Sequence, residues 1–157
     1  MEAGIGGEDS TLQTCENARK SYTAVDKDGV ALMLADLAEI ERRRGELRKA
    51  LSGYLEARTV AQEIDDKRAV AYTLSGAADV LFDQGDLEAS RDSYQKSLAL
   101  RKEIGDKHTV AETELALSRL SIEEGHPADA ETVIRKLYRQ RPSRRYEDRS
   151  LATSASG

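Results

Sequence analysis

The sequence has little cysteine and no long apolar run, and each shortage excludes a class of protein. Cys15 is the single cysteine among 157 residues, so the chain can form no internal disulfide. This favours a reducing environment, and we expect a cytoplasmic protein. The first ten residues lack the basic start and apolar core of a secretion signal, and no run approaches the roughly 18 apolar residues of a membrane span. Unless the chain is a piece of a longer one, we expect neither export nor a membrane partner.

Charge of one sign does not accumulate anywhere in the sequence. Charged residues make up 34% of the chain, the formal net charge is -5, and no long run of one sign occurs. Because nucleic-acid binding needs a clustered basic surface, we expect no nucleic-acid partner. The most basic tract, residues 41–49, also contains Glu41 and Glu46, which indicates a solvated helix end.

The motifs of catalytic and metal sites are missing as well. Residues 93–96 read Ser-x-x-Lys, but the partner motifs of that class of enzyme are absent. His108 and His126 fall in predicted loops without metal-ligand spacing. The stretch AVDKDGVA, residues 24–31, begins like a calcium loop, yet neither register supplies the glutamate required at the twelfth position. We therefore expect no enzyme, no metal and no cofactor.

A repeat of 40 residues is present in place of these motifs. The segments IDDKRAVA at 64–71 and IGDKHTVA at 104–111 echo AVDKDGVA at that spacing, and a fixed period of this length is typical of a solenoid. Identical residues recur at the aligned positions of the three units. They are Asp26, Asp66 and Asp106; Lys27, Lys67 and Lys107; Val30, Val70 and Val110; Ala31, Ala71 and Ala111; and Gly45, Gly85 and Gly125.

Each unit has the pattern of two antiparallel helices. The chain contains only two prolines, and between Lys67 and Gly85 its apolar residues recur at helical spacing. Gly85 can end the first helix in a left-handed conformation, and Asp86 can cap the second. No long alternation of period two predicts a strand. The predicted helices are 29–44, 47–63, 69–84, 87–103, 109–124 and 127–140, preceded by one at about 11–24 that opens with a capping box.

Residues 74–100 resemble the tetratricopeptide repeat. The pattern is a large residue, a small one, Gly-Asp, a small residue, an aromatic and another small residue. Its members are Leu74, Ala78, Gly85, Asp86, Ser90, Tyr94 and Ser97. The 40-residue spacing resembles the lengthened variety of kinesin light chains, polarity adaptors and bacterial arrays. The resemblance implies an all-α, right-handed superhelical solenoid of antiparallel helix pairs, with about three repeats plus one N-terminal helix.

The predicted domain boundaries follow from this register. Residues 1–9 form a flexible N-terminus, residues 10–140 the repeat domain, and residues 141–157 a tail. Leu151 and Ala152 stand where another first helix would begin, so the tail is either the truncated start of a further repeat, which we favour, or a disordered end. The outer helices would then lack the polar caps that solenoids usually carry.

The resemblance implies that the first helices line a concave groove that binds a peptide or a partner helix. Geometry gives the side chains of these helices that point away from their core stripes. The candidate partner-binding residues are Leu32, Arg42, Arg43, Tyr72, Asp79, Phe82, Leu115, Arg119 and Ile122. Packing between neighbouring first helices is the competing use of this face. The terminal-carboxylate clamp of the chaperone-binding subgroup is not expected, because Ser75 and Asp79 occupy the comparable face.

We therefore predict a non-catalytic protein-interaction module. Two alternatives remain open at this point. One is a regulatory or sensor segment of a larger signalling protein that carries a kinase or DNA-binding domain. The other is a structural solenoid that self-associates through uncapped ends, because the exposed end faces of solenoids are apolar.

Overall fold

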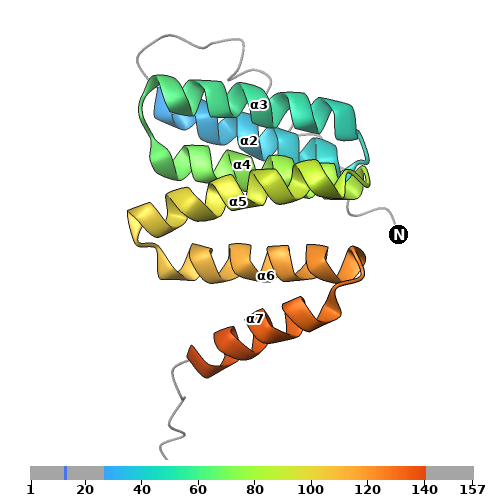
Figure 1. Cartoon of the computed structure of the whole chain (residues 1–157). Helices are drawn as coiled ribbons and strands as arrows, with labels where there is room; N and C mark the ends of the chain where they lie inside the picture. Colours follow the sequence, from blue (N-terminus) through green and yellow to red (C-terminus); the bar gives the residue numbers. More distant parts are fainter. Residues whose placement is uncertain (1–12, 14–26, 141–157) are drawn as a thin grey trace, which may run out of the picture.

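The computed structural model describes residue 13 and residues 27–140. Six helices follow one another in residues 27–140, and no strand occurs there. Figure 1 shows them as successive antiparallel pairs stacked in chain order. The predicted all-α solenoid of helix pairs is confirmed. The helices are α2 (Lys27–Arg43), α3 (Leu47–Glu63), α4 (Lys67–Asp83), α5 (Leu87–Ile104), α6 (Lys107–Glu123) and α7 (Pro127–Gln140).

The first helices begin earlier than the sequence pattern predicts. α4 and α6 start at Lys67 and Lys107, two residues before the predicted starts. The cause is the aspartate of each Asp-Lys joint: the Asp66 side chain accepts two backbone N–H groups of the first turn, at 2.9 and 3.0 Å. Asp106 caps α6 in the same way. Such a cap satisfies N–H groups that have no partner inside the helix, so His108 lies in the first turn of α6 and not in a loop.

Glycine ends each first helix, as predicted. Gly45, Gly85 and Gly125 have φ values of 79°, 82° and 84°, in the left-handed region that a side chain disfavours. Asp86 then caps α5 by accepting the N–H of Ala89 at 3.1 Å. The glycine turns that end the first helices therefore recur with the 40-residue period of the sequence.

Small residues let the two helices of a pair approach closely. Ala50, Ser90 and Ala130 occupy one repeat position and are buried. The Ser90 hydroxyl donates to the Ala78 carbonyl at 2.8 Å, which joins α5 to α4. Tyr54 and Tyr94 are buried at a second repeat position, whereas Ile134 at that position is exposed on α7.

The third pair is more open than the first two. Ala57 and Ser97 are fully buried at one repeat position, and Ser97 donates to the Ala71 carbonyl at 2.7 Å. The third unit has Leu137 there, too large for the same close approach. Figure 1 shows α7 diverging from α6 toward its C-terminal end, and a cavity of about 1020 Å³ lies there, lined by Leu137 and Gln140 among others.

Several sequence predictions lie outside the described residues. They are the flexible segment 1–9, the helix at about 11–24 except for residue 13, and the tail 141–157. Cys15 is also outside the described part. Of the helices that the structure does describe, none is long and apolar enough to cross a membrane.

Candidate binding groove

The first helices of the three pairs share one groove. Its cavity has a volume of about 660 Å³ and is lined mainly by α2, α4 and α6, with two side chains from α5 and one each from α3 and α7. Seven of the nine candidate partner-binding residues line it; Leu32 and Phe82 do not. The seven are Arg42, Arg43, Tyr72, Asp79, Leu115, Arg119 and Ile122.

Three of these residues expose apolar surface in the groove. The exposed fractions are 41% for Tyr72, 53% for Leu115 and 50% for Ile122. Leu32, which has the repeat position of Tyr72, is also exposed on α2. Packing between neighbouring first helices therefore leaves these side chains available for contact with another molecule.

Phe82 serves the packing between α4 and α6. Its ring is half-buried and packs against the cluster of Ala78, Tyr94 and Leu120. The guanidinium of Arg119 lies over the ring, 4.6 Å from its centre, which is the geometry of a cation–π contact. Phe82 thereby helps to position the half-exposed Arg119 side chain in the groove.

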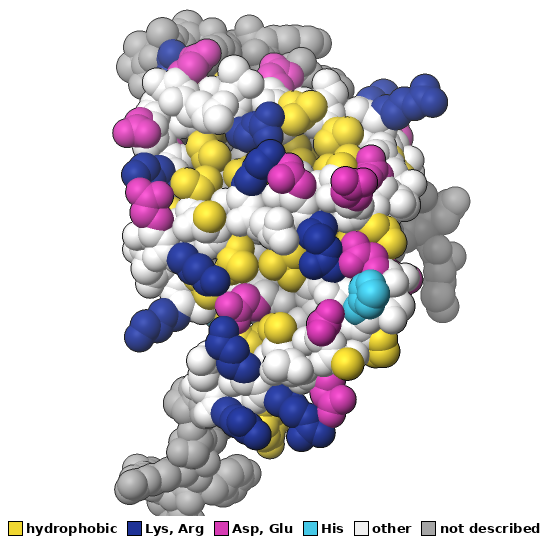
Figure 2. Space-filling model, in the orientation of Figure 1, with side chains coloured by type: hydrophobic (Ala, Val, Ile, Leu, Met, Phe, Trp, Pro, Cys, Tyr) yellow, Lys and Arg dark blue, Asp and Glu magenta, His cyan; other side chains and the backbone are white. Residues whose placement is uncertain are grey.

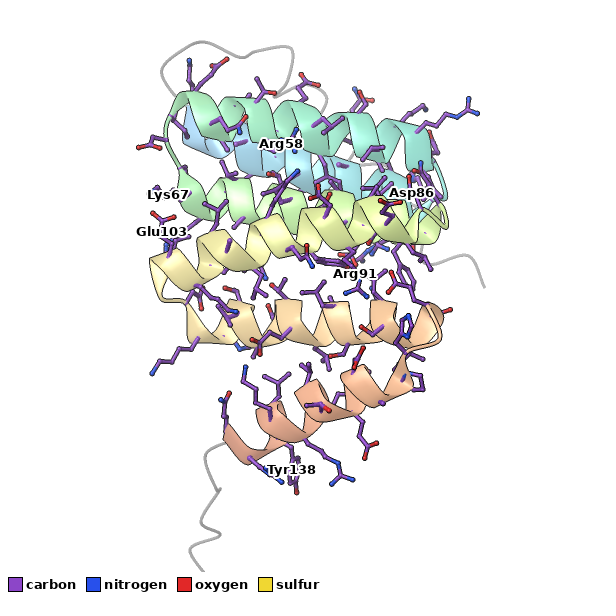
Figure 3. All side chains as sticks on the ribbon, in the orientation of Figure 1. Arg58, Lys67, Asp86, Arg91, Glu103 and Tyr138 are labelled. Atoms are coloured by element: carbon purple, nitrogen blue, oxygen red, sulfur yellow. The ribbon has the colours of Figure 1, made fainter. Side chains whose placement is uncertain are left out.

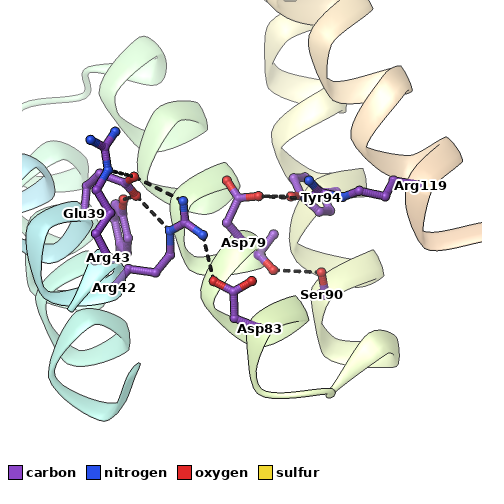
Figure 4. A network of polar contacts seen from close by, with 10 residues as sticks. Glu39, Arg42, Arg43, Asp79, Asp83, Ser90, Tyr94 and Arg119 are labelled. Atoms are coloured by element: carbon purple, nitrogen blue, oxygen red, sulfur yellow. Dashed lines mark hydrogen bonds and ion pairs between the residues drawn. The ribbon is translucent and has the colours of Figure 1, made fainter. Parts of the chain in front are cut away.

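An ion-pair network joins α2 to α4 along the groove (Figure 4). Arg42 grips Glu39 with two parallel hydrogen bonds, Nε to Oε2 at 2.9 Å and Nη2 to Oε1 at 3.1 Å. Its Nη1 donates to Asp83 on α4 at 2.7 Å, and Arg43 donates to Glu39 at 2.9 Å. Both arginines are therefore held in place by carboxylates of the chain itself.

Tyrosine–carboxylate pairs repeat along the array. The Tyr54 hydroxyl donates to Glu39 at 3.1 Å, and Tyr94 donates to Asp79 one repeat later. The third unit has Arg119 at the position of the acid, and Arg119 donates back to Asp79 at 3.2 Å. The network thus runs from α2 through α4 to α6.

The surroundings of Glu39, Tyr54 and Tyr94 shift the pKa values of these three residues. Hydrogen bonds from Arg42, and with them those from Arg43, lower the pKa of Glu39 to about 2, against the opposing effect of partial burial. Burial raises the pKa values of Tyr54 and Tyr94 well above the usual range. Glu39 is therefore ionised and both tyrosines are neutral donors at physiological pH, so the groove keeps one arrangement of charges.

Arg101 is a groove residue that the sequence analysis missed. Its side chain lines the cavity although only 9% of the residue is exposed. Its Nη1 donates to the Thr109 carbonyl at 2.9 Å and to the Thr113 hydroxyl at 2.6 Å. The residue one repeat earlier is Ala61, which is fully buried between helix pairs. The change from alanine to arginine at a core position of the repeat is the feature of the sequence that indicates an unusual role for Arg101.

Metal binding finds no support in the described part of the chain. No group of three His, Cys, Asp or Glu residues there could hold a metal ion. His108 lies 3.3 Å from Glu112 in the next turn of α6, an ordinary surface pair.

Comparison with known proteins supports the helical-repeat architecture. The family described as tetratricopeptide repeat matches residues 29–103 and 70–143. No curated protein matches the sequence significantly. Among solved structures 43 chains match; one is the crystal structure of BtubC (BKLC) from P. vanneervenii, 20% identical to this chain with a TM-score of 0.76. The match covers 85% of this chain and 56% of that one, and at this identity the likeness concerns the fold alone.

Proposed function

Since the chain belongs to the tetratricopeptide repeat family, we propose that it is a non-catalytic module that binds a peptide or partner helix in the groove lined by α2, α4 and α6. Members of this family generally mediate protein–protein interaction. The observation that carries the proposal is the exposure of Tyr72, Leu115 and Ile122 in one cavity. Apolar side chains inside a rim of charge are the usual core of a recognition surface.

The ion pairs connect the three first helices, α2, α4 and α6, in the absence of a partner. Arg42 links α2 to α4, and Arg119 links α6 to α4. A preformed groove loses less conformational entropy on binding than a mobile one. We assign the binding energy chiefly to the exposed apolar residues, because Arg42 and Arg119 already have carboxylate partners.

Selection from a displayed peptide library tests the proposal. The selected peptide is measured by fluorescence anisotropy on wild type and on the variant Tyr72→Ala, Leu115→Ala, Ile122→Ala. Loss of three exposed anchors should weaken binding at least about 100-fold, since each 1.4 kcal/mol is about tenfold and central anchors contribute roughly that much.

Leu55→Ala is the matched control, because Leu55 is similarly exposed on the second helix α3 and does not line the groove. This variant should bind the peptide as wild type does. A triple variant with wild-type helicity by circular dichroism and undiminished affinity would show that the groove is not the binding surface.

Self-association is a second candidate, favoured by the outer face of α7. Tyr138 is 75% exposed and points away from the other helices in Figure 3. On the face shown in Figure 2, by contrast, apolar side chains form separate patches between charged ones. Light scattering over a concentration series decides the question: a monomer at the highest concentration excludes this candidate.

The cysteine content is the one feature of the sequence that bears on the cellular compartment. The single cysteine suits a reducing compartment, and we place the protein in the cytoplasm. A tagged full-length protein recovered outside the cytoplasmic fraction would contradict that placement.

A further inference from the structure

Arg101 differs from the other arginines of the groove in its partners. Arg42, Arg43 and Arg119 each contact a carboxylate of the chain. Arg101 contacts none among the described residues; it bonds only the Thr109 carbonyl and the Thr113 hydroxyl, both through Nη1. It is nevertheless 91% buried, since 9% of the residue is exposed. A buried guanidinium is usually paired with a carboxylate.

The unbonded edge of Arg101 opens into the groove. In the described part of the chain, no fully buried side-chain nitrogen or oxygen lacks a hydrogen-bond partner. Since neither Nε nor Nη2 of Arg101 has a partner among the residues that the structure describes, each must reach accessible surface, and the residue lines the groove cavity. Nε and Nη2 together form the edge with which arginine grips a carboxylate by two parallel hydrogen bonds. Arg42 holds Glu39 with that same edge.

The side chains that line the cavity around Arg101 carry a net positive charge, which favours the binding of an anion. Four arginines and three carboxylates line the cavity, which gives it one net positive charge in a chain of net charge -5. Asp79 is held by Arg119 and Tyr94, and Glu112 lies beside His108. Asp79, Glu112 and Asp106 therefore act on Arg101 only at longer range. Burial nevertheless lowers the pKa of Arg101, so these carboxylates do not compensate its charge fully.

We propose that the Nε–Nη2 edge of Arg101 is a carboxylate-binding subsite of the groove, which takes one carboxylate of the bound peptide. The inference rests on the proposed function and specifies its ligand: an apolar segment that carries an acidic group. The carboxylate is either an Asp or Glu side chain or the C-terminus of the peptide. Asp79 does not exclude it from the groove, because Arg119 balances the charge of Asp79 and Tyr94 donates a hydrogen bond to the same carboxylate.

The test observes Arg101 directly and needs no known partner. The side-chain Nε–H signals of wild-type protein are followed by NMR while sodium acetate replaces sodium chloride at constant ionic strength. Arg91 is the internal control, because it lies on the same helix and its Nε and Nη2 already hold Glu124. We expect a saturable shift of the Arg101 signal and none of the Arg91 signal. An unmoved Arg101 signal, or shifts that are equal for both arginines, would overturn the proposal.

Two further probes separate the sources of the carboxylate. Acetylglutamate amide presents only a side-chain carboxylate, and acetylleucine presents only a chain-terminal one. Whichever saturates the Arg101 signal at the lower concentration identifies the source, and failure of both overturns the subsite.

The variant Arg101→Lys keeps the positive charge but lacks the two N–H groups of the Nε–Nη2 edge. Followed through the backbone signal of Thr113, it should bind acetate at least about tenfold more weakly, since a hydrogen bond to a charged group is worth about that factor. Arg91→Lys should bind acetate as wild type does. Undiminished binding by a folded Arg101→Lys variant contradicts the proposal. Acetate binding does not depend on Tyr72, Leu115 or Ile122, so failure of this subsite and failure of the groove as a peptide site give different results.

Discussion

Replacing Gly76 with alanine should destabilise the array, although alanine is the better helix former. Gly76 lies within α4 and faces Tyr54 of α3. A Cβ atom at Gly76 would stand 2.2 Å from Cε1 and 2.3 Å from Cζ of the Tyr54 ring, whereas non-bonded carbons rest at about 3.5–4.0 Å. The ring would have to move by more than an ångström.

The Tyr54 ring has little freedom to make that movement. It is buried in the cluster formed with Ala38, Ala50 and Ala77, and its hydroxyl is held by Glu39 at 3.1 Å. Overpacking of a core costs about 1–3 kcal/mol, and a lost hydrogen bond to a charged group costs about 1.5–3 kcal/mol. The gain in helix propensity from glycine to alanine is only about 1 kcal/mol. We expect a net loss of about 2–4 kcal/mol in the free energy of unfolding.

Urea denaturation followed by circular dichroism measures this loss. Gly53→Ala is the control within a helix, because its Cβ would meet the Ala38 Cβ at 3.0 Å, a milder contact that should cost less. In a Tyr54→Leu background the Gly76→Ala change should cost nothing, since the ring atoms it meets are gone. A Gly76→Ala protein as stable as wild type would show that the Tyr54 ring does not pack against the α4 backbone at Gly76.

Three further changes probe the core, a helix cap and the ion pairs. Leu120→Ala should lower the free energy of unfolding by about 2–5 kcal/mol because the side chain is fully buried, while Leu115→Ala on the exposed face of the same helix should change it by less than about 0.5 kcal/mol; urea denaturation compares the two. Asp66→Ala should cost about 1 kcal/mol of stability by removing the α4 cap, and Asp66→Asn should restore most of it; equal losses in both would contradict the capping role. The pKa of Glu39 is lowered from 4.5 to about 2 in the folded chain, so its ion pairs stabilise the fold fully above pH 4.5 and their contribution is lost as the pH falls toward 2. Thermal melts across that range should show a smaller loss of stability for Glu39→Gln than for wild type, and parallel curves would count against the pairing.

The helix-pair register could be predicted from the sequence because it depends on local chemistry. Gly85 adopts a left-handed conformation at the end of α4, and Asp66 caps the N-terminus of the same helix. Both features depend on the residues next to them in the sequence and not on distant ones. Helical geometry and the same register pointed to this face of the first helices, and Tyr72 and Leu115 line the cavity there.

The partners of the charged groove residues could not be predicted in this way. Arg119 reaches Asp79 across 40 residues of sequence, and helical periodicity says nothing about which of several acids a long side chain will meet. Burial of Arg101 depends on the spacing between α5 and α6, which periodicity does not determine either. The same holds for Gly76, whose role appears only once the Tyr54 ring is in place.

The opening between α6 and α7 could be predicted only in part from the sequence. Leu137 stands where Ala57 and Ser97 are fully buried, so alignment of the three units could have shown a large residue at a small position. The divergence of α7 that accompanies it is a property of packing and required the structure.

Photo-crosslinking with a library-selected peptide identifies the surface of the protein that the peptide contacts. The peptide carries a photoreactive group, and mass spectrometry identifies the residues to which it becomes attached. If the groove binds the peptide, we expect attachment to the groove side of α4 and α6, at or next to Tyr72, Leu115 and Ile122. Attachment concentrated instead at Tyr138 on the outer face of α7, or at Leu55 on α3, would show that the peptide binds outside the groove.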